Sequence, residues 1–210
     1  MNKNKMIIFD LDGTFYPKNH WLTDVLRTTT KNWIKDSLNL SLEEVESIYL
    51  TLQKKYPNPY HGFQSLGLSP QDYLMNVFNV TNPSTYISED KKLIKLFKNL
   101  PVSKHVATLS SEKYASQLIR SLGLESLITS VNSLINFGPS FEKISIYEEL
   151  RSHESLKPSQ ILIVGDNYDV DLKDAEIQGY TICLVNNTPL RKSHSKYLSD
   201  LLVVNELTKG

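Results

Sequence analysis

Residues 6–14, Met-Ile-Ile-Phe-Asp-Leu-Asp-Gly-Thr, constrain the fold of this chain more than any other stretch. A short continuous apolar run that ends in a turn signal is typical of a strand buried inside a parallel sheet. Asp10 and Asp12 follow this strand directly, and Gly13 and Thr14 come next. Open α/β sheets bind ligands in the crevice beyond the carboxyl ends of their strands, so this stretch predicts a ligand site at the sheet edge.

The composition fits a globular protein without a polyanionic partner. The 210 residues include 23 basic and 23 acidic ones, so no net charge attracts nucleic acid or an anionic lipid surface. No stretch approaches the roughly 18 consecutive apolar residues of a membrane span. The four apolar residues before Asp10 are too few for the core of a signal peptide. We therefore expect a cytoplasmic protein whose partners are neither nucleic acid polymers nor membranes. Its single cysteine, Cys183, is predicted to be buried in a strand.

The spacing of apolar residues divides the chain into two parts. Residues 16–87 repeat apolar positions at helical intervals and contain no clear strand. In the remainder of the chain, short apolar strands alternate with helices, which is typical of a doubly wound parallel sheet. We expect a Rossmann-like α/β core of residues 1–15 and 88–210, with an α-helical cap, residues 16–87, inserted after the first strand.

Local signals place the elements within these two parts. Ser41 and Glu44 form a capping box that predicts a helix start, and residues 56–68 are rich in Pro and Gly and predict a loop. Further helices are expected over 144–150 and 170–178. The strands expected after the first one span 104–109, 128–131, 161–164, 181–185 and 201–204.

Polar side chains lie at the ends of three of the expected strands. They are Asp10 and Asp12, then Thr108, and finally Asp166 with Asp171. Carboxylates without a nearby cation repel one another, and a hard cation is the simplest neutraliser. Mg²⁺ suits such a site because it takes few protein carboxylates, retains waters and completes its shell with substrate phosphate. The sequence therefore predicts a magnesium site.

An aspartate can also act as a nucleophile and form an aspartyl-phosphate, and Asp10 is the candidate for this role. Gly13 permits a sharp turn that points Asp12 back towards the same space. There Asp12 would protonate the leaving-group oxygen and later deprotonate the attacking water. The electron-rich group in transfer needs donors and positive charge, and the Thr108 hydroxyl and Lys143 fit these roles.

In this order and spacing the residues resemble the four motifs of the haloacid dehalogenase-like hydrolase superfamily. Those motifs are a strand ending in Asp-x-Asp-x-Thr, a strand ending in Thr or Ser, a Lys, and an acidic Gly-Asp-x-x-x-x-Asp. The matching residues are Asp10-Leu11-Asp12-Gly13-Thr14, Thr108, Lys143, and Gly165-Asp166 with Asp171. The resemblance covers essentially the whole chain. It implies Mg²⁺ ligated by the side chains of Asp10 and Asp166 and the backbone carbonyl of Asp12, with Asp171 supporting the metal shell.

The second and third motifs depart from the family pattern. Family members commonly carry Asn after the motif Thr, where this chain has Leu109, so Ser110 is an alternative second-motif residue. We favour Thr108 because Ala115, seven residues further on, takes the small helix position usual in the family. Lys143 lacks the proline that usually follows it. The predicted phosphate-binding residues are Thr108, Leu109 and Lys143.

The resulting hypothesis is a Mg²⁺-dependent phosphatase acting on a small phosphorylated metabolite. An aspartate at position 12 is similar to the phosphatases of the superfamily rather than to true dehalogenases, which lack it. The stretches Phe-Asp-Leu-Asp-Gly-Thr-Phe-Tyr-Pro and Lys-His-Val-Ala-Thr resemble the pyrimidine 5'-nucleotidase branch. A phosphomutase on the same frame and a catalytically weak binding or regulatory member are the alternatives. The sequence does not indicate an oligomeric state.

Overall fold

The computed structural model describes residues 4–185, and its centre is a sheet of five parallel strands in the order β3-β2-β1-β4-β5. The first strand of the chain therefore lies in the middle of the sheet, and its four residues are all fully buried. Burial on both faces explains the continuous apolar run. The strands are β1 Met6–Phe9, β2 Ser103–Thr108, β3 Ser130–Ser133, β4 Ile161–Gly165 and β5 Thr181–Leu184.

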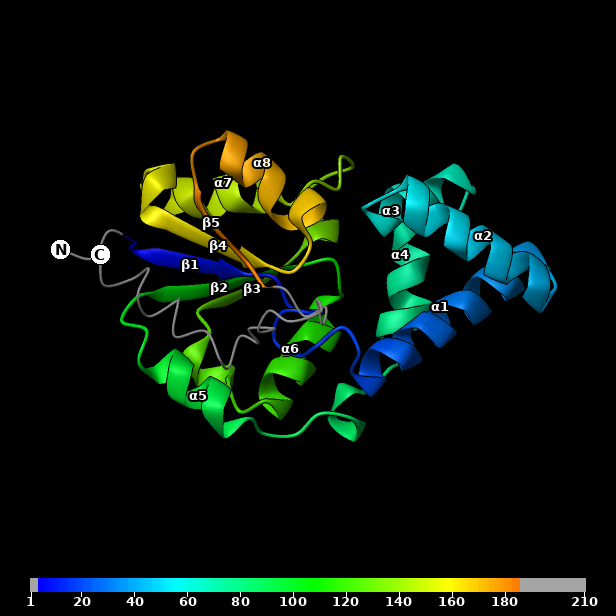
Figure 1. The fold of residues 1–210 in the computed structure, drawn as a ribbon, viewed down its shortest axis with the longest axis horizontal. Helices are drawn as coiled ribbons and strands as arrows, with labels where there is room; N and C mark the ends of the chain where they lie inside the picture. The colour runs from blue at the N-terminus through cyan, green and yellow to red at the C-terminus, as the bar shows by residue number, and fades with distance from the viewer. Residues whose placement is uncertain (1–3, 186–210) are drawn as a thin grey trace, which may run out of the picture.

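Helices cover both faces of this sheet (Figure 1). One face carries α5 and α6, and the other carries α7 and α8. These helices span α5 Lys91–Lys98, α6 Glu112–Ser121, α7 Ile144–His153 and α8 Lys173–Ile177. The chain leaves the sheet towards opposite faces on the two sides of β1, so the ligand crevice of a doubly wound fold lies beside this strand. The predicted Rossmann-like α/β class is confirmed.

The register brings three strand ends to the same edge. Phe9 of β1 is level with Val106 of β2 and with Val164 of β4. The N–H of Asp10 continues the ladder by donating to the Val164 carbonyl at 2.8 Å. Since parallel strands all point the same way, the polar residues at the ends of β1, β2 and β4 meet at this edge.

A group of helices lies beyond that edge, inserted between β1 and β2 (Figure 1). Residues 16–87, all of which the structure describes, contain no strand. The helices are α1 Trp21–Leu38, α2 Leu42–Lys55, α3 Pro59–Ser65 and α4 Pro70–Tyr73, which continues as a π-helical turn, η1, over Leu74–Phe78. A 3-10 turn, η2, over Pro83–Thr85 leads back to the core. We call residues 21–78 the helical segment.

Several local predictions can be compared with these elements. The capping box of Ser41 and Glu44 is confirmed, and Cys183 is buried in β5 as expected. The predicted loop at 56–68 is wrong in its middle, because α3 forms there with Asn58 accepting the Tyr60 N–H as its N-cap. The short strand expected at 128–131 begins two residues later, as β3. The strand expected at 201–204 lies outside the described residues.

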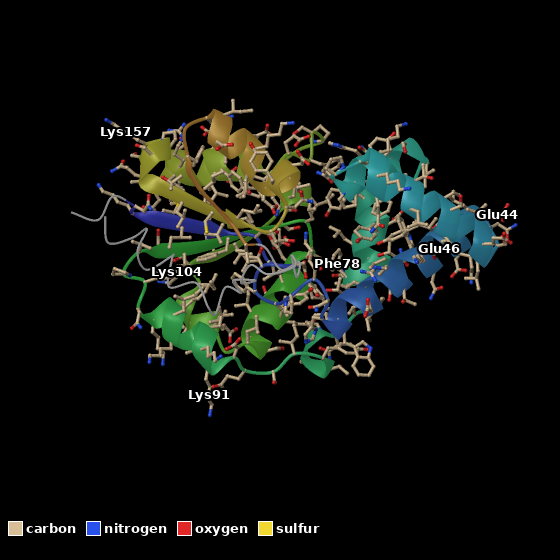
Figure 2. The ribbon with its side chains drawn as sticks, in the orientation of Figure 1. Glu44, Glu46, Phe78, Lys91, Lys104 and Lys157 are labelled. Carbon is tan, nitrogen blue, oxygen red and sulfur yellow. The ribbon has the colours of Figure 1, made fainter. Side chains whose placement is uncertain are left out.

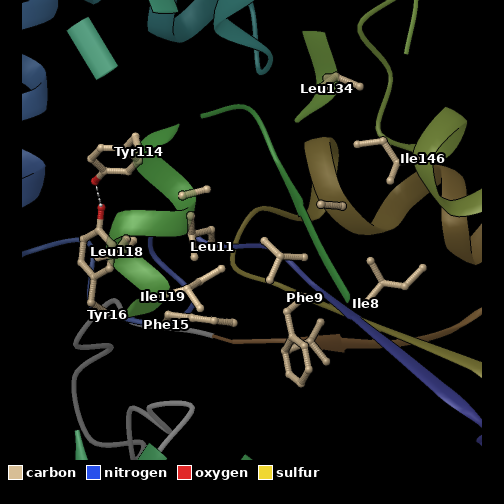
Figure 3. Packing of buried hydrophobic residues seen from close by; sticks show 14 of the residues in the cluster. Ile8, Phe9, Leu11, Phe15, Tyr16, Tyr114, Leu118, Ile119, Leu134 and Ile146 are labelled. Atoms are coloured by element: carbon tan, nitrogen blue, oxygen red, sulfur yellow. Dashed lines mark hydrogen bonds between the residues drawn. The ribbon is translucent and has the colours of Figure 1, made fainter. Parts of the chain in front are cut away.

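The apolar core supports the turn that follows β1 (Figure 3). Leu11 and Phe15 are buried next to Leu118 and Ile119 of α6. The Phe9 and Phe15 rings meet edge to face with centroids 5.7 Å apart. These contacts fix the path of the chain on both sides of Asp12. Among the described helices, none combines the length and apolar character needed to cross a bilayer.

Candidate active site

The turn after β1 is closed by short-range hydrogen bonds. The N–H groups of Thr14 and Phe15 donate to the Leu11 carbonyl at 3.2 and 2.9 Å. The Thr14 hydroxyl donates to Asp10 Oδ2 at 3.0 Å. Gly13 has φ +90°, and a Cβ there would lie 2.7 Å from Asp166 Oδ2. Glycine at this position therefore allows both the backbone conformation and the close approach of Asp166.

Lys143 connects two of the predicted site carboxylates. It immediately precedes α7, and its buried ammonium donates to Asp10 Oδ1 at 2.5 Å and to Asp171 Oδ1 at 2.6 Å. Burial alone would lower the pKa of Lys143, but the two carboxylates raise it well above its usual range, so the group stays charged. The structure thus brings Lys143 to Asp10, although 133 residues separate them in sequence.

Asp171 is held in place by a π-helical turn over Tyr168–Leu172. Its Oδ2 accepts the N–H of Asn167 at 2.9 Å, and the Tyr147 hydroxyl donates to its backbone carbonyl at 3.1 Å. Burial raises the pKa of the Asp171 carboxyl, and the charge of Lys143 opposes that shift. Turns of this kind occur frequently at functional sites.

Asp166 completes a cluster of three carboxylates. Oxygens of Asp10, Asp166 and Asp171 all lie within 4.8 Å of one another. The Asp166 side chain is only 5% exposed and forms an ion pair with the ammonium of Lys18. Three carboxylates this close, with two of the residues buried, are a set of hard oxygen donors that fits Mg²⁺. The cluster contains Asp171 and not the Asp12 side chain.

Asp12 has a different environment, made of hydroxyl groups. Its Oδ1 accepts hydrogen bonds from the hydroxyls of Tyr16 at 2.5 Å and Tyr114 at 3.2 Å, and its Oδ2 accepts one from Ser110. The two tyrosine hydroxyls also lie 3.4 Å from each other (Figure 3). Burial raises the pKa of the Asp12 carboxyl, while the three donors act in the opposite direction. A carboxyl group with a raised pKa is suited to donate a proton.

The second-motif residues lie at the end of β2. Thr108 is buried, and its Oγ1 accepts the Ser110 N–H at 3.0 Å. The Ser110 hydroxyl is directed to Asp12, and the Leu109 carbonyl accepts a hydrogen bond from the Tyr60 hydroxyl. The two candidates for the second-motif residue therefore differ in their hydrogen bonds: the Ser110 hydroxyl donates to a carboxylate, whereas the Thr108 hydroxyl accepts from a backbone N–H.

A cavity of about 220 Å³ connects these groups. Asp10, Asp12, Thr108, Leu109, Lys143, Asp166 and Asp171 all line it, so the structure brings every predicted site residue to one space. The helical segment supplies Pro59, Tyr73 and Phe78 on the opposite side, and Figure 2 shows Phe78 at the junction with the core. Two further cavities of about 330 and 410 Å³ adjoin it and share Pro59 and Tyr73.

Hydrogen bonds hold the helical segment to the core around this cavity. Asn58 Nδ2 donates to the Phe141 carbonyl at 2.6 Å, and His61 Nε2 lies 2.9 Å from the Ser140 carbonyl oxygen. The Ser111 hydroxyl donates to Asn79 Oδ1 at 2.7 Å, just beyond the helical segment. Direct hydrogen bonds therefore join the two parts of the chain close to residues that line this cavity, such as Pro57 and Pro59.

Four residues of the site were missed in the sequence. The sequence suggests Ser110 only as an alternative second-motif residue, and Tyr114 has the helical spacing of a core residue. Tyr16 carries a weak signal, since it follows Asp12 by four residues and a tight turn can bring such a pair together. Lys18 has no comparable signal, because its partner Asp166 is 148 residues away.

Comparisons with known proteins agree with this architecture. The family model described as haloacid dehalogenase-like hydrolase matches residues 7–185. No curated protein sequence matches significantly. A HAD phosphatase from Thermococcus onnurineus has a TM-score of 0.61 at 15% identity, over 96% of this chain and 97% of that one. The HAD-hydrolase YfnB from Bacillus subtilis, bound to magnesium, has a TM-score of 0.60 at 14% sequence identity, and the match covers 99% of this chain and 100% of that one. L-2-haloacid dehalogenase from Xanthobacter autotrophicus has a TM-score of 0.50 at 16% sequence identity, and the match covers 87% of this chain and 77% of that one.

A doubly wound sheet with carboxylates gathered at its central strand ends defines an α/β enzyme class that binds its ligand at the sheet edge. The matched family model spans most of the chain, so the protein belongs to the haloacid dehalogenase-like hydrolase family. The solved structures share its fold at low identity, and they include both a phosphatase and a dehalogenase.

Proposed function

We propose that this hydrolase is a Mg²⁺-dependent phosphatase that cleaves a small phosphomonoester through an aspartyl-phosphate on Asp10. The observation that carries the proposal is the contrast between two carboxylates two residues apart. Asp10 binds Lys143 and Thr14, whereas Asp12 binds three hydroxyls, and both line the same cavity. The ammonium and hydroxyl beside Asp10 suit a positioned nucleophile, and the hydroxyl groups around Asp12 suit an acid and base.

The two half-reactions follow from these positions. An oxygen of Asp10 attacks phosphorus, the bond from phosphorus to the leaving oxygen breaks, and Asp12 gives that oxygen its proton. Asp12 then takes a proton from water, whose oxygen bonds to phosphorus while the bond from phosphorus to Asp10 breaks. Both carboxyl groups return to their starting states. Thr108 and Lys143 offer donors and positive charge to the phosphoryl oxygens.

Mg²⁺ would be held by Asp10 and Asp166, with Asp171 beside them, and the family resemblance adds the backbone carbonyl of Asp12. When bound, the ion supplies positive charge between the carboxylates and the phosphoryl group. The residues support this assignment through their clustering and their hard oxygen donors.

We further propose that residues 16–87 form a cap over a core of residues 1–15 and 88–210. Pro59, Tyr73 and Phe78 of the helical segment line the reaction cavity, which supports this division. A cap in this place excludes water from the phosphoryl group while Asp10 is attacking.

The substrate is proposed to be a nucleotide, sugar phosphate or similar metabolite, and the nucleotidase-like motifs favour trying nucleoside monophosphates first. Phosphate release is measured with Mg²⁺ over a panel of these compounds, without any acceptor besides water. Transfer that occurs only with a second hydroxyl compound would instead indicate a phosphomutase. A specific binding partner together with no turnover of any compound would indicate a regulatory member.

The mechanism is tested by Asp10→Asn, which should lower kcat by on the order of 10³-fold or more, since the nucleophile is lost. Asp169→Asn is the matched control, because Asp169 is exposed and lies in the same π-helical turn as Asp171, three residues after Asp166. It should keep the wild-type rate. An Asp10→Asn variant that retains full phosphatase activity would refute the aspartyl-phosphate.

A further inference from the structure

Lys18 lies at the junction of two cavities and binds a residue of the proposed metal site. Its ammonium pairs with the Asp166 carboxylate and lies 3.4 Å from the Asp166 carbonyl oxygen. The Lys18 side chain is 52% exposed, whereas that of Asp166 is 5% exposed. Lys18 lines the cavity that holds Asp10 and also the adjoining cavity of about 410 Å³ that extends to Arg27. It is thus a cation on a flexible stem between the phosphoryl site and the space for the rest of the substrate.

This ion pair and a divalent cation compete for the same carboxylate. A cation bound by Asp166 would neutralise the charge that attracts Lys18 and would repel its ammonium directly. The Lys18 ammonium can move away from Asp166, because the side chain is half exposed and lines the adjoining cavity instead of being packed in the core.

The adjoining cavity offers a displaced ammonium little negative charge. Among the described residues that line it, Asp12 is the only carboxylate, and three hydroxyls already occupy Asp12. The other polar side chains there are those of Lys18, Arg27, Gln53, three tyrosines and two threonines, and all of them can donate hydrogen bonds. Two of these donors are already engaged, since the Thr30 hydroxyl donates to the Leu26 carbonyl and the Tyr16 hydroxyl donates to Asp12. Arg27 already pairs with Asp24 at 2.8 Å, so among the described residues lining this cavity Lys18 is the cation left to meet a negatively charged group on the ligand once a metal holds Asp166.

We propose that Lys18 selects phosphomonoesters whose leaving group carries a second anionic group, a carboxylate or another phosphate. In the metal-free protein the Lys18 ammonium pairs with Asp166, and on metal binding it turns to the anionic group of the substrate. This inference rests on the proposed phosphatase function for its second half, whereas the competition for Asp166 is independent of it.

The competition is tested by calorimetric titration with Mg²⁺ alone, without any substrate. Lys18→Met should bind Mg²⁺ at least threefold more tightly than the wild type, because the competing ammonium is gone. Lys18→Arg keeps the charge and should restore weaker binding. Lys91→Met is the control, since Lys91 is exposed on the outer side of α5 (Figure 2). Equal Mg²⁺ affinity in the wild type, Lys18→Met and Lys91→Met would overturn the competition.

The selectivity is tested with matched substrate pairs that differ in one anionic group. 3-Phosphoglycerate and glycerol 3-phosphate test the carboxylate, and fructose 1,6-bisphosphate and fructose 1-phosphate test the second phosphate. The wild type should prefer the more anionic member of at least one pair. Lys18→Met should reduce that preference in kcat/KM at least tenfold, mainly through KM, and Lys18→Arg should restore part of it.

Two results separate this inference from the proposed function. If the wild type releases phosphate but prefers neither anionic member, or Lys18→Met lowers both members of a pair equally, the selectivity is wrong and the phosphatase stands. If no compound in the wider panel is hydrolysed, the phosphatase proposal fails with the selectivity, and the Mg²⁺ titration alone decides the role of Lys18 at Asp166.

Discussion

Gly13→Ala tests how closely the turn after β1 and the metal site depend on each other. The substitution places a Cβ 2.7 Å from Asp166 Oδ2 and 2.9 Å from its Cγ, closer than real Cβ atoms approach. The backbone there has φ +90°, which costs a residue with a side chain about 1–3 kcal/mol. The lower entropy of the unfolded chain offsets roughly 0.4–1 kcal/mol of this. We expect a net loss of about 1–2 kcal/mol and a Tm lower by about 2–8 °C.

Gly67→Ala is the matched control for the contact with Asp166. Gly67 also has positive φ, +75°, but a Cβ there would meet nothing within 4 Å. It should lower Tm by a similar amount in thermal unfolding and leave Mg²⁺ affinity unchanged. Gly13→Ala should in addition weaken Mg²⁺ binding about tenfold in calorimetry, because Asp166 must move. Wild-type Mg²⁺ affinity in Gly13→Ala would refute the reasoning.

Three other perturbations follow from buried polar groups. Lys143→Met leaves two buried carboxylates without their cation and should lower the free energy of unfolding by about 3–5 kcal/mol in urea titrations. A loss below about 1 kcal/mol would contradict the buried ion pairs of Lys143 with Asp10 and Asp171. Tyr114→Phe removes a hydrogen-bond donor to Asp12 and should lower kcat. Tyr180→Phe is the control, because its hydroxyl donates to Glu148, which does not line the site cavity, and it should keep the wild-type kcat. Equal kcat values in the two variants would exclude a role for the Tyr114 hydroxyl. Burial lowers the pKa of His105, so below about pH 6.5 the unfolded chain binds more protons than the folded one and the free energy of unfolding should fall. His105→Gln should make Tm fall less steeply between pH 8 and pH 5. An unchanged dependence of Tm on pH would contradict this role of His105.

The sheet and its site edge were predictable because they depend on local patterns. The apolar run before Asp10 and the one before Asp166 each indicate a buried parallel strand, and parallel strands necessarily bring their carboxyl ends to one edge. The order of strands then places Thr108 beside them. Lys143 was predicted from its motif position, and its contact with both carboxylates depends on the packing of α7, which no local pattern encodes.

The remaining features depend on contacts between distant parts of the chain or on competing signals. The prolines and glycines in residues 56–68 predict a loop, yet Pro59 occupies the first turn of α3, where a missing N–H costs nothing. Tyr114 has the spacing of a core residue and is fully buried, so only the folded structure reveals that its hydroxyl reaches Asp12, 102 residues away.

The contact between the Tyr60 hydroxyl and the Leu109 carbonyl has a consequence for how this enzyme can diversify. The groups assigned to phosphoryl transfer come from the strand ends and from Lys143, and none belongs to residues 21–78. The helical segment touches the second-motif loop through a backbone carbonyl, which every amino acid at position 109 provides. Residues lining the helical side of the cleft can therefore be exchanged during evolution, and new leaving groups accommodated, while the reaction chemistry is inherited unchanged.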